Sequence, residues 1–278
     1  MPHTRIFRFA PSPNGFLHLG HAYSALLNFK LARECAGRFL LRIEDIDLSR
    51  ARPRFEAAIY EDLRWLGLDW ERPVRRQSEH FADYREALRR LYAQGLLYPC
   101  DCARKDLALR SGKEGPRDPD GAPLYPGTCR ARPRVAFEDA LKPGVALRLD
   151  MERARAGLKL RWAEADLGDV EARPDQWGDV VLARKDTPAS YHLAVVVDDA
   201  LQGVTDVVRG EDLLPSTSVH RLLQELLGLP TPRYRHHRLL LDPGGEKLAK
   251  TRGSKSLRDL REAGVTPETA RRLAGFPD

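Results

Sequence analysis

The sequence predicts an α/β fold in which a parallel sheet of the nucleotide-binding type is interrupted by a smaller insertion. Residues 5–43 read as strand, helix and strand, and parallel strands need such a crossover helix. The 278 residues are 42% hydrophobic and 31% charged, which excludes a disordered chain, a collagen-like fibre and a disulfide scaffold. A chain of this length can bury a full core as one large domain or two smaller ones.

The net charge and the number of cysteines further limit the class of protein to which this chain can belong. Lys and Arg number 46 against 40 Asp and Glu, a net charge of +6 that permits contact with a polyanion without requiring it. Four cysteines in so long a chain indicate reduced thiols or a metal site. No apolar run approaches the roughly 20 residues that span a bilayer, and residues 1–8 lack the apolar core of a signal peptide. We therefore expect a cytoplasmic protein without membrane contact.

Hydrophobic spacing defines the elements of the first half of the chain. They are strands at 5–10 and 39–43 and helices at 19–37, 55–66 and 81–94. The Pro-Ser-Pro-Asn-Gly sequence at 11–15 breaks the first strand, because two prolines and an Asn-Gly pair resist regular structure.

The amino-acid composition of the chain changes after Tyr98. Residues 111–126 are rich in Gly, Pro and charge and read as a flexible insertion. Residues 194–197, Ala-Val-Val-Val, are the most β-prone run in the chain, so 191–198 are predicted to form a hairpin with 180–184. The other predicted elements are two short strands within 145–162, strands at 205–209 and 239–241, and helices at 216–227 and 257–275.

The sequence His18-Leu19-Gly20-His21 lies where the first strand leads into the first helix. Unpaired backbone N–H groups and the positive end of the helix dipole point there. Two histidines three residues apart can face one ligand and donate to phosphate oxygens, and Gly20 removes a side chain where that ligand approaches. The alternative is a pair of surface histidines that flank a glycine.

A second basic motif, Lys247-Leu248-Ala249-Lys250-Thr251, follows a Gly-Gly loop. Two lysines three residues apart on a loop can close over a triphosphate and neutralise charge as it develops. The alternative is an ordinary solvated basic loop.

Four motifs together resemble one enzyme family. Residues 8–15, leading into the His18 motif, resemble the class I aminoacyl-tRNA synthetases in the form used for glutamate and glutamine, and residues 247–251 resemble the second lysine motif of that class. Residues 42–47 and 207–214 also resemble the glutamate branch. The motifs occur in family order.

The resemblance implies a Rossmann-like parallel sheet with an inserted smaller α+β domain and a short helical C-terminus. The corresponding boundaries are 1–95 and 186–241 for the two halves of the catalytic domain, 96–185 for the insertion with a candidate zinc site, and 242–278 for the lysine loop and last helices. The implied reaction is activation of L-glutamate with ATP and Mg²⁺.

The resemblance also assigns site residues. The implied catalytic residues are His18, His21, Lys247 and Lys250, and the implied ATP-binding residues are His18, Gly20, His21 and Lys250. The implied glutamate-binding residues are Arg8, Phe9, Ala10, Pro11, Ser12, Glu44, Tyr191 and Arg209. In this scheme the arginines bind carboxylates, Glu44 pairs with the ammonium group, and Tyr191 and Ser12 add hydrogen bonds. Without the family, Glu44 and Arg209 would read as a surface ion pair and Tyr191 as a core residue of a strand.

Only 27 residues follow Thr251, which is enough for one or two helices. We therefore expect the shortened branch of the family, without an anticodon-binding region, and Ile46 also resembles that branch. This branch activates glutamate without tRNA and attaches it to queuosine at the wobble position of tRNA(Asp). The implied partners are L-glutamate, ATP and tRNA(Asp) carrying queuosine, for a monomer without an obligatory protein partner.

Cys100, Cys102 and Cys129 form a candidate metal cluster. Three thiolates suit tetrahedral zinc in a structural role, and the resemblance places Tyr125 as the fourth ligand of one Zn²⁺ per chain. The alternative is three free thiols. Cys35 is expected to be a small residue of the core.

Basic residues cluster at 50–54, 130–134 and 233–238. The last cluster interleaves Tyr and His with Arg, which suits an RNA backbone or an unpaired base, although solvated surface is an equal interpretation.

Three other functions stay open from the sequence. The first is a compact glutamyl-tRNA synthetase that charges a tRNA 3′ end with help from a separate anticodon-reading protein. The second is a catalytically inactive RNA-binding paralogue. The third is an unrelated nucleotidyltransferase on the same fold.

Overall fold

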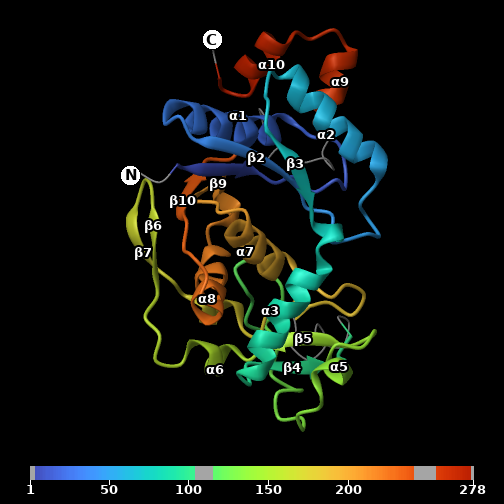
Figure 1. Ribbon diagram of the computed structural model, residues 1–278, viewed down its shortest axis with the longest axis vertical. Helices are drawn as coiled ribbons and strands as arrows, with labels where there is room; N and C mark the ends of the chain where they lie inside the picture. Colours follow the sequence, from blue (N-terminus) through green and yellow to red (C-terminus); the bar gives the residue numbers. More distant parts are fainter. Residues whose placement is uncertain (1–3, 104–114, 241–254, 277–278) are drawn as a thin grey trace.

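A parallel sheet crosses the middle of the molecule in the computed structural model, which describes residues 4–103, 115–240 and 255–276 (Figure 1). Within these residues seven strands form the sheet, in the order β3 (Glu71–Arg76), β2 (Arg38–Ile43), β1 (Ile6–Phe9), β9 (Asp206–Gly210), β10 (Arg233–His237), β6 (Arg161–Glu164) and β7 (Gly168–Glu171). Neighbouring strands are parallel except β6 and β7. The predicted parallel α/β fold is confirmed.

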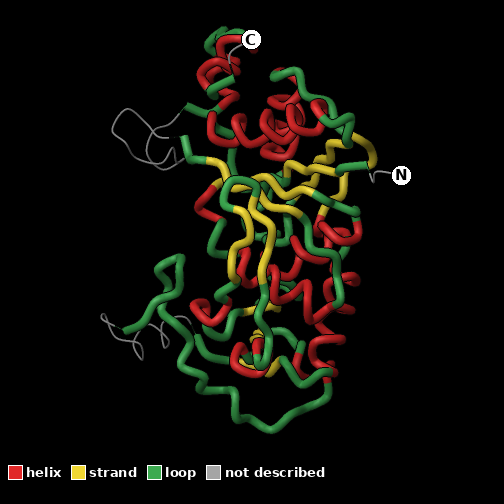
Figure 2. Tube along the Cα trace, turned by 90° about the vertical axis from the view of Figure 1, so that its left-hand side faces the viewer, coloured by secondary structure: helices red, strands yellow, loops and turns green. Residues whose placement is uncertain are grey.

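Two layers of helices cover this sheet (Figures 1 and 2). One layer contains α1 (Leu19–Glu34), α2 (Pro53–Trp65), α9 (Leu257–Glu262) and α10 (Pro267–Leu273), and the other contains α3 (Phe81–Ala93), α7 (Tyr191–Leu201) and α8 (Thr217–Leu227). The layer with α1 shares one apolar core with strands β1 and β2, and the layer with α7 has a second apolar core of its own, which also includes residues 97, 147, 149, 182 and 183. Burial of these apolar faces is the main term that favours the fold.

A smaller antiparallel sheet lies at the end of the molecule opposite the C-terminal helices (Figure 1). In the described part of the chain it contains β4 (Leu97–Cys100), β5 (Ala146–Leu149) and β8 (Val181–Ala183), with α5 (Phe137–Ala140) and α6 (Met151–Arg155) nearby. Strands β6 and β7 instead extend the large sheet beside β10. The range 96–185, expected to be one insertion, is therefore divided between the two sheets, and one of the two strands predicted within 145–162 is followed by the short helix α6.

The predicted hairpin at 191–198 is wrong, because this segment is the helix α7. The Ser190 side chain caps its first turn by accepting a hydrogen bond from the Leu193 amide at 3.5 Å. Residues 193–199 are all buried between α3, α8 and the sheet. Capping and burial on every side outweigh the modest strand preference of the three valines.

Three smaller expectations also differ. The strand predicted at 239–241 is not seen at Leu239 and Leu240, because β10 ends earlier at His237; residue 241 lies outside the described residues. Strand β3 was not predicted, because its exposed, mostly charged residues show no apolar alternation. Cys35 is exposed rather than in the core, since it caps the C-terminus of α1.

Short 3₁₀ helices occur in the connections at Gln77–Glu79, Pro174–Trp177 and Glu211–Leu213.

No helix in the described ranges combines the length and apolarity needed to cross a bilayer.

Candidate active site

A cavity of about 600 Å³ opens where strands β1, β2, β9 and β10 end. The carboxyl edge of a parallel sheet is where such folds bind ligands. Its lining includes every predicted substrate or nucleotide residue that the structure describes: Arg8, Phe9, Ala10, Pro11, Ser12, His18, Gly20, His21, Glu44, Tyr191 and Arg209. Residues from β1 and from β9, two hundred positions apart, therefore meet at one site.

The two histidines form the amino-terminal cap of α1. Nδ1 of His18 accepts a hydrogen bond from the Gly20 amide at 3.1 Å, and the His18 amide donates to Nδ1 of His21 at 3.2 Å. The ring centroids lie 3.9 Å apart. A Cβ on Gly20 would lie 3.0 Å from the His18 ring, so the glycine permits this cap. Both imidazoles are held at the positive end of a helix dipole, which suits a phosphate ligand.

Lys247 and Lys250 lie outside the described residues, so the structure does not place them. The chain on either side of them is described. Leu240 lines the cavity, and Ser256 pairs with His18 in an antiparallel bridge. The Leu257 amide also donates to the Leu17 carbonyl at 2.8 Å. The described residues on either side of the lysine motif thus lie at the cavity and beside the histidines.

Arg209 is a buried cation at the end of β9. Its guanidinium donates to Tyr191 Oη at 3.1 Å, to Thr217 Oγ1 at 2.8 Å and to the Leu213 carbonyl at 3.1 Å. Among the described residues no carboxylate forms an ion pair with it. A buried charge without a charged partner is costly, so this arginine is suited to receive an anionic group of a ligand.

Histidines surround Arg209 on its protein side. Nε of Arg209 donates to His236 Nε2 at 3.1 Å, and His236 in turn contacts Glu164 at 2.8 Å. His220 Nδ1 lies 3.3 Å from the guanidinium. Burial, together with Arg209, lowers the pKa of His220 well below its ordinary value and also lowers the pKa of His236. Neutral imidazoles can support the arginine without adding a competing positive charge.

Arg8 and Glu44 supply a cation and an anion to the same cavity. Arg8 on β1 forms an ion pair with Asp199 at 3.0 Å, and Glu44 after β2 forms one with Arg42 at 3.1 Å. Burial raises the pKa of Glu44, and Arg42 opposes this. The cavity therefore contains the opposite charges that an amino-acid zwitterion requires.

Asp199, Arg42, Thr217, His220 and His236 were not predicted from the sequence as residues of the site. The only signal for Arg42 was a charge within the apolar run 39–43, since a charge in a buried strand requires a buried partner. The sequence did not identify that partner.

The three cysteines of the candidate metal cluster are brought together near β4. Their sulfur atoms lie within 4.8 Å of one another, and Cys102 Sγ is 3.6 Å from Cys129 Sγ. The Tyr125 hydroxyl lies 3.5 Å from Cys100 Sγ and 3.7 Å from Cys102 Sγ. Ligand separations of about 3.8 Å are expected around zinc with Zn–S bonds of about 2.3 Å. The donor set and its spacing fit a zinc ion.

The pKa shifts differ within this cluster: burial raises the pKa of Cys102, and Cys100 is the thiol that favours a cation. Burial acts to raise the pKa of Cys100, but hydrogen bonds from Tyr125 and Arg148 lower it to about 7. A thiol that ionises near neutral pH is a good zinc ligand.

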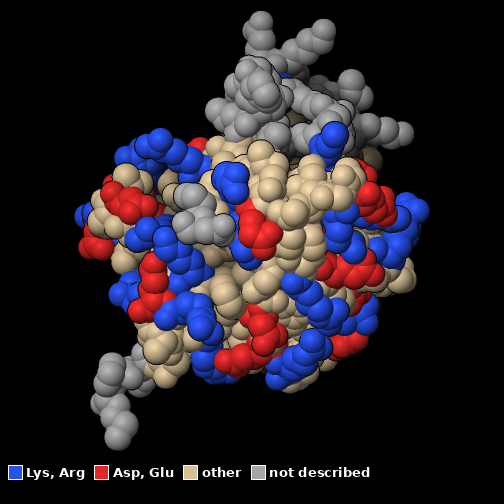
Figure 3. Space-filling model, turned by 90° about the horizontal axis from the view of Figure 1, so that it is seen from above, with Lys and Arg blue, Asp and Glu red and all other residues tan. Residues whose placement is uncertain are grey.

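The predicted basic clusters are surface features with acidic neighbours. Arg233 lies 3.4 Å from Asp206, and on the face above α9 and α10 basic side chains are interspersed with acidic ones (Figure 3). Tyr234 and His237 are buried. The His236 side chain is buried as well. The expectation that the rings of the 233–238 cluster stack on an RNA base is therefore wrong, and only its arginines remain candidates for RNA contact.

Comparison with known proteins identifies the class. The chain belongs to the family described as tRNA synthetases class I (E and Q), catalytic domain, which matches residues 5–275. It is therefore a ligase of the aminoacyl-tRNA synthetase type, a class for which ATP is a substrate. The glutamate-tRNA synthetase of Elizabethkingia anophelis has the same fold, with a TM-score of 0.72 and 28% identity over 94% of this chain and 54% of that chain.

Two relatives locate the chain within the family. It is 49% identical to the Glutamyl-Q tRNA(Asp) synthetase of Rhodobacter capsulatus, over 98% of this chain and 100% of that protein. It is 39% identical to the Glutamate–tRNA ligase of Aquifex aeolicus, over 94% of this chain but 54% of that ligase. The predicted resemblance to the shortened branch is confirmed.

Proposed function

We propose that this protein activates L-glutamate with ATP, without tRNA, and then transfers the glutamate to queuosine at the wobble position of tRNA(Asp). The observation that carries the proposal is the cavity in which the helix-capping histidine pair, Arg8, Arg209 and the Glu44 carboxylate meet. The name of the Rhodobacter relative, which aligns over its whole length, supports the queuosine acceptor.

The amino-acid half of the cavity suits a substrate with two carboxylates and an ammonium group. Arg209 and Arg8 would bind the carboxylates, Glu44 would bind the ammonium group, and Tyr191 and Ser12 would add hydrogen bonds. The absence of a carboxylate partner for Arg209 among the described residues supports this assignment, because a substrate carboxylate would supply one.

The nucleotide half would bind the triphosphate. The glutamate α-carboxylate would attack the α-phosphate of ATP in line, and pyrophosphate would leave. His18, His21 and the first turn of α1 would contact the phosphates from one side, and Lys247 and Lys250 from the other. Mg²⁺ would enter with ATP as its counter-ion and neutralise phosphate charge.

The zinc site would be structural. Cys100, Cys102, Tyr125 and Cys129 would hold one Zn²⁺ and join β4 to the loop that precedes α5. We also propose that the protein acts as a monomer without a protein partner, which its mass in solution would test.

Two measurements test the proposal. Glutamate-dependent ATP–pyrophosphate exchange in the absence of tRNA tests activation, and no exchange with any amino acid would favour an inactive RNA-binding paralogue. Transfer of labelled glutamate to tRNA(Asp) with and without queuosine tests the acceptor. Equal transfer to both tRNAs would favour a compact synthetase that charges the 3′ end.

A further inference from the structure

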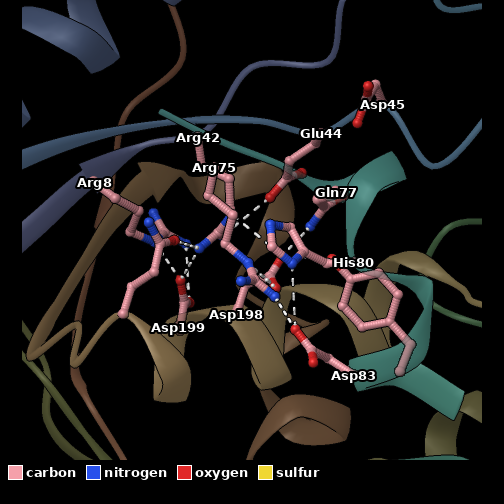
Figure 4. Close-up of polar contacts among 12 residues, drawn as sticks. Arg8, Arg42, Glu44, Asp45, Arg75, Gln77, His80, Asp83, Asp198 and Asp199 are labelled. Carbon is pink, nitrogen blue, oxygen red and sulfur yellow. Dashed lines mark hydrogen bonds and ion pairs between the residues drawn. The ribbon is translucent and has the colours of Figure 1, made fainter. Parts of the chain in front are cut away.

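A buried ionic network contacts Arg8 and Glu44, two residues of the amino-acid half of the cavity (Figure 4). It contains Arg42 on β2 and the consecutive residues Asp198 and Asp199 on α7, and all three are at least 95% buried. None of them was assigned a role above. The cost of burying several charges calls for a function beyond packing alone.

Asp199 supports Arg8 from behind. Its Oδ1 accepts hydrogen bonds from Arg8 Nε at 3.0 Å and from Arg42 Nη1 at 2.7 Å, and its Oδ2 accepts a third from Arg8 Nη2 at 3.4 Å. Within the described part of the chain, Nη1 of Arg8 makes no hydrogen bond. Asp199 thus fixes one edge of the guanidinium and leaves the other edge for a ligand.

Arg42 supports Glu44 in the same manner. Its Nη2 donates to Glu44 Oε1 at 3.1 Å while its Nη1 holds Asp199. The Arg42 side chain is fully buried, so it cannot contact a substrate itself. Charge-assisted bonds of this kind are strong and set the orientation of both partners.

We propose that Arg42 and Asp199, the backing pair, are positioning residues that hold Arg8 and Glu44 apart in the amino-acid site. A cavity that binds a zwitterion needs a cation and an anion of its own, and these attract each other across the empty site. An anion behind the cation and a cation behind the anion satisfy each charge on its protein side. Arg8 and Glu44 do not form an ion pair with each other in the described structure, as this arrangement requires.

The inference rests on the proposed function, because it concerns how glutamate is bound. Neutralising Asp199 would release Arg8 toward Glu44, and the two groups would then neutralise each other instead of binding glutamate. ATP binding at the histidine cap should be unaffected, since the side-chain hydrogen bonds of the backing pair go to Arg8, Glu44 and Gln202 on the amino-acid side of the site.

The neighbouring aspartate provides a matched control. Asp198 lies on the same helix, is equally buried, and accepts hydrogen bonds from Arg75, Gln77 and Tyr84. Its closest atom to Arg42 is 3.8 Å away, an ion pair without a hydrogen bond, and it does not contact Arg8. Asp198→Asn therefore tests loss of a buried charge without loss of the backing pair.

The experiment compares Asp199→Asn and Asp198→Asn in glutamate-dependent ATP–pyrophosphate exchange, with thermal unfolding of each variant. We expect Asp199→Asn to raise the KM for glutamate by about tenfold or more, from the loss of charge-assisted bonds to Arg8. We expect its KM for ATP to stay within about twofold. Asp198→Asn should lower the melting temperature similarly, with a KM for glutamate within about threefold of the wild type.

Two results would overturn the inference. One is an unchanged KM for glutamate in folded Asp199→Asn, and the other is an equal rise in both variants. If Asp199→Asn does not fold, Arg42→Lys replaces it, because one ammonium group cannot span Asp199 and Glu44 as the guanidinium does; an unchanged KM for glutamate there also overturns the inference. Absence of glutamate-dependent exchange in the wild type would instead refute the proposed function and, with it, this inference.

Discussion

Replacement of Arg209 by lysine tests the amino-acid site most directly. The substitution keeps the positive charge and removes the planar fork. Arg209 uses its fork to donate to Tyr191, Leu213, Thr217 and His236 at distances of 2.8–3.1 Å. A lysine has one nitrogen with three donors, so it cannot keep all four contacts, whereas the guanidinium has five N–H groups and keeps one for a substrate carboxylate.

The number of hydrogen bonds that Arg209→Lys would lose determines how far kcat/KM for glutamate should fall. Hydrogen bonds that involve a charged group contribute about 1.5–3 kcal/mol each. Loss of the one such bond at the substrate carboxylate corresponds to about 1.5–3 kcal/mol, or a fall of about tenfold to somewhat more than a hundredfold in kcat/KM for glutamate. Because Arg209 is expected to contact the glutamate and not the triphosphate, the KM for ATP should change little.

The assay is ATP–pyrophosphate exchange at varied glutamate concentration, and Arg235→Lys is the control. Arg235 lies on the neighbouring strand β10, is 39% exposed, and approaches Asp166 only to 3.9 Å. Its replacement should leave kcat/KM within about twofold, as expected for an exposed ion pair. A folded Arg209→Lys variant with kcat/KM within about threefold of the wild type would refute the role of Arg209 in carboxylate binding.

Three further predictions concern the metal, the core and the RNA. Cys129→Ser should lower the zinc content well below one ion per chain and the melting temperature by about 5 °C or more; a metal-free wild type of equal stability would contradict the zinc site. Burial raises the pKa of Asp62 to about 6 despite Arg261, so ionisation of this carboxyl destabilises the fold as the pH rises from about 4 to 6. The free energy of unfolding of Asp62→Asn, measured with denaturant and compared with that of the wild type, should therefore be about 1–2 kcal/mol more favourable at pH 7.5 than at pH 4, after allowance for solvent screening. A constant difference at both pH values would refute that pKa. Replacing the three arginines of 233–238 by serine should weaken glutamate transfer to tRNA, with a reduced salt dependence, and leave exchange unchanged; unchanged transfer would exclude this surface as an RNA contact.

Residues of the candidate site could be predicted from the sequence where they interact with residues close to them in the sequence. His18 and His21 lie in one helix cap, so four consecutive residues define most of their geometry. The ending of α8 at Gly228 was equally local, because a left-handed C-cap favours glycine. Such features need no knowledge of distant contacts.

The support of the site was not predictable, because its contacts join distant parts of the chain. Asp199 forms hydrogen bonds with Arg42 and Arg8, which are 157 and 191 residues away in the sequence. Composition and periodicity report only that a residue is buried or exposed, and they do not identify its partner. Arg42 within an apolar strand therefore indicated that a buried anion exists, without locating it.

Helix α7 was predicted as a strand, and the ionic network around Arg42 was not predicted, for the same physical reason. Residues 194–197 favour a strand by local preference, but in a strand consecutive side chains point to opposite faces. Asp198 and Asp199 could not then both approach Arg42, at 3.8 and 2.7 Å. In a helix, adjacent side chains are separated by about 100°, so both carboxylates can reach the same arginine while one continues to Arg8 and the other to Arg75. The tertiary arrangement of charges behind the substrate cavity thus requires the helical conformation that the local sequence disfavours.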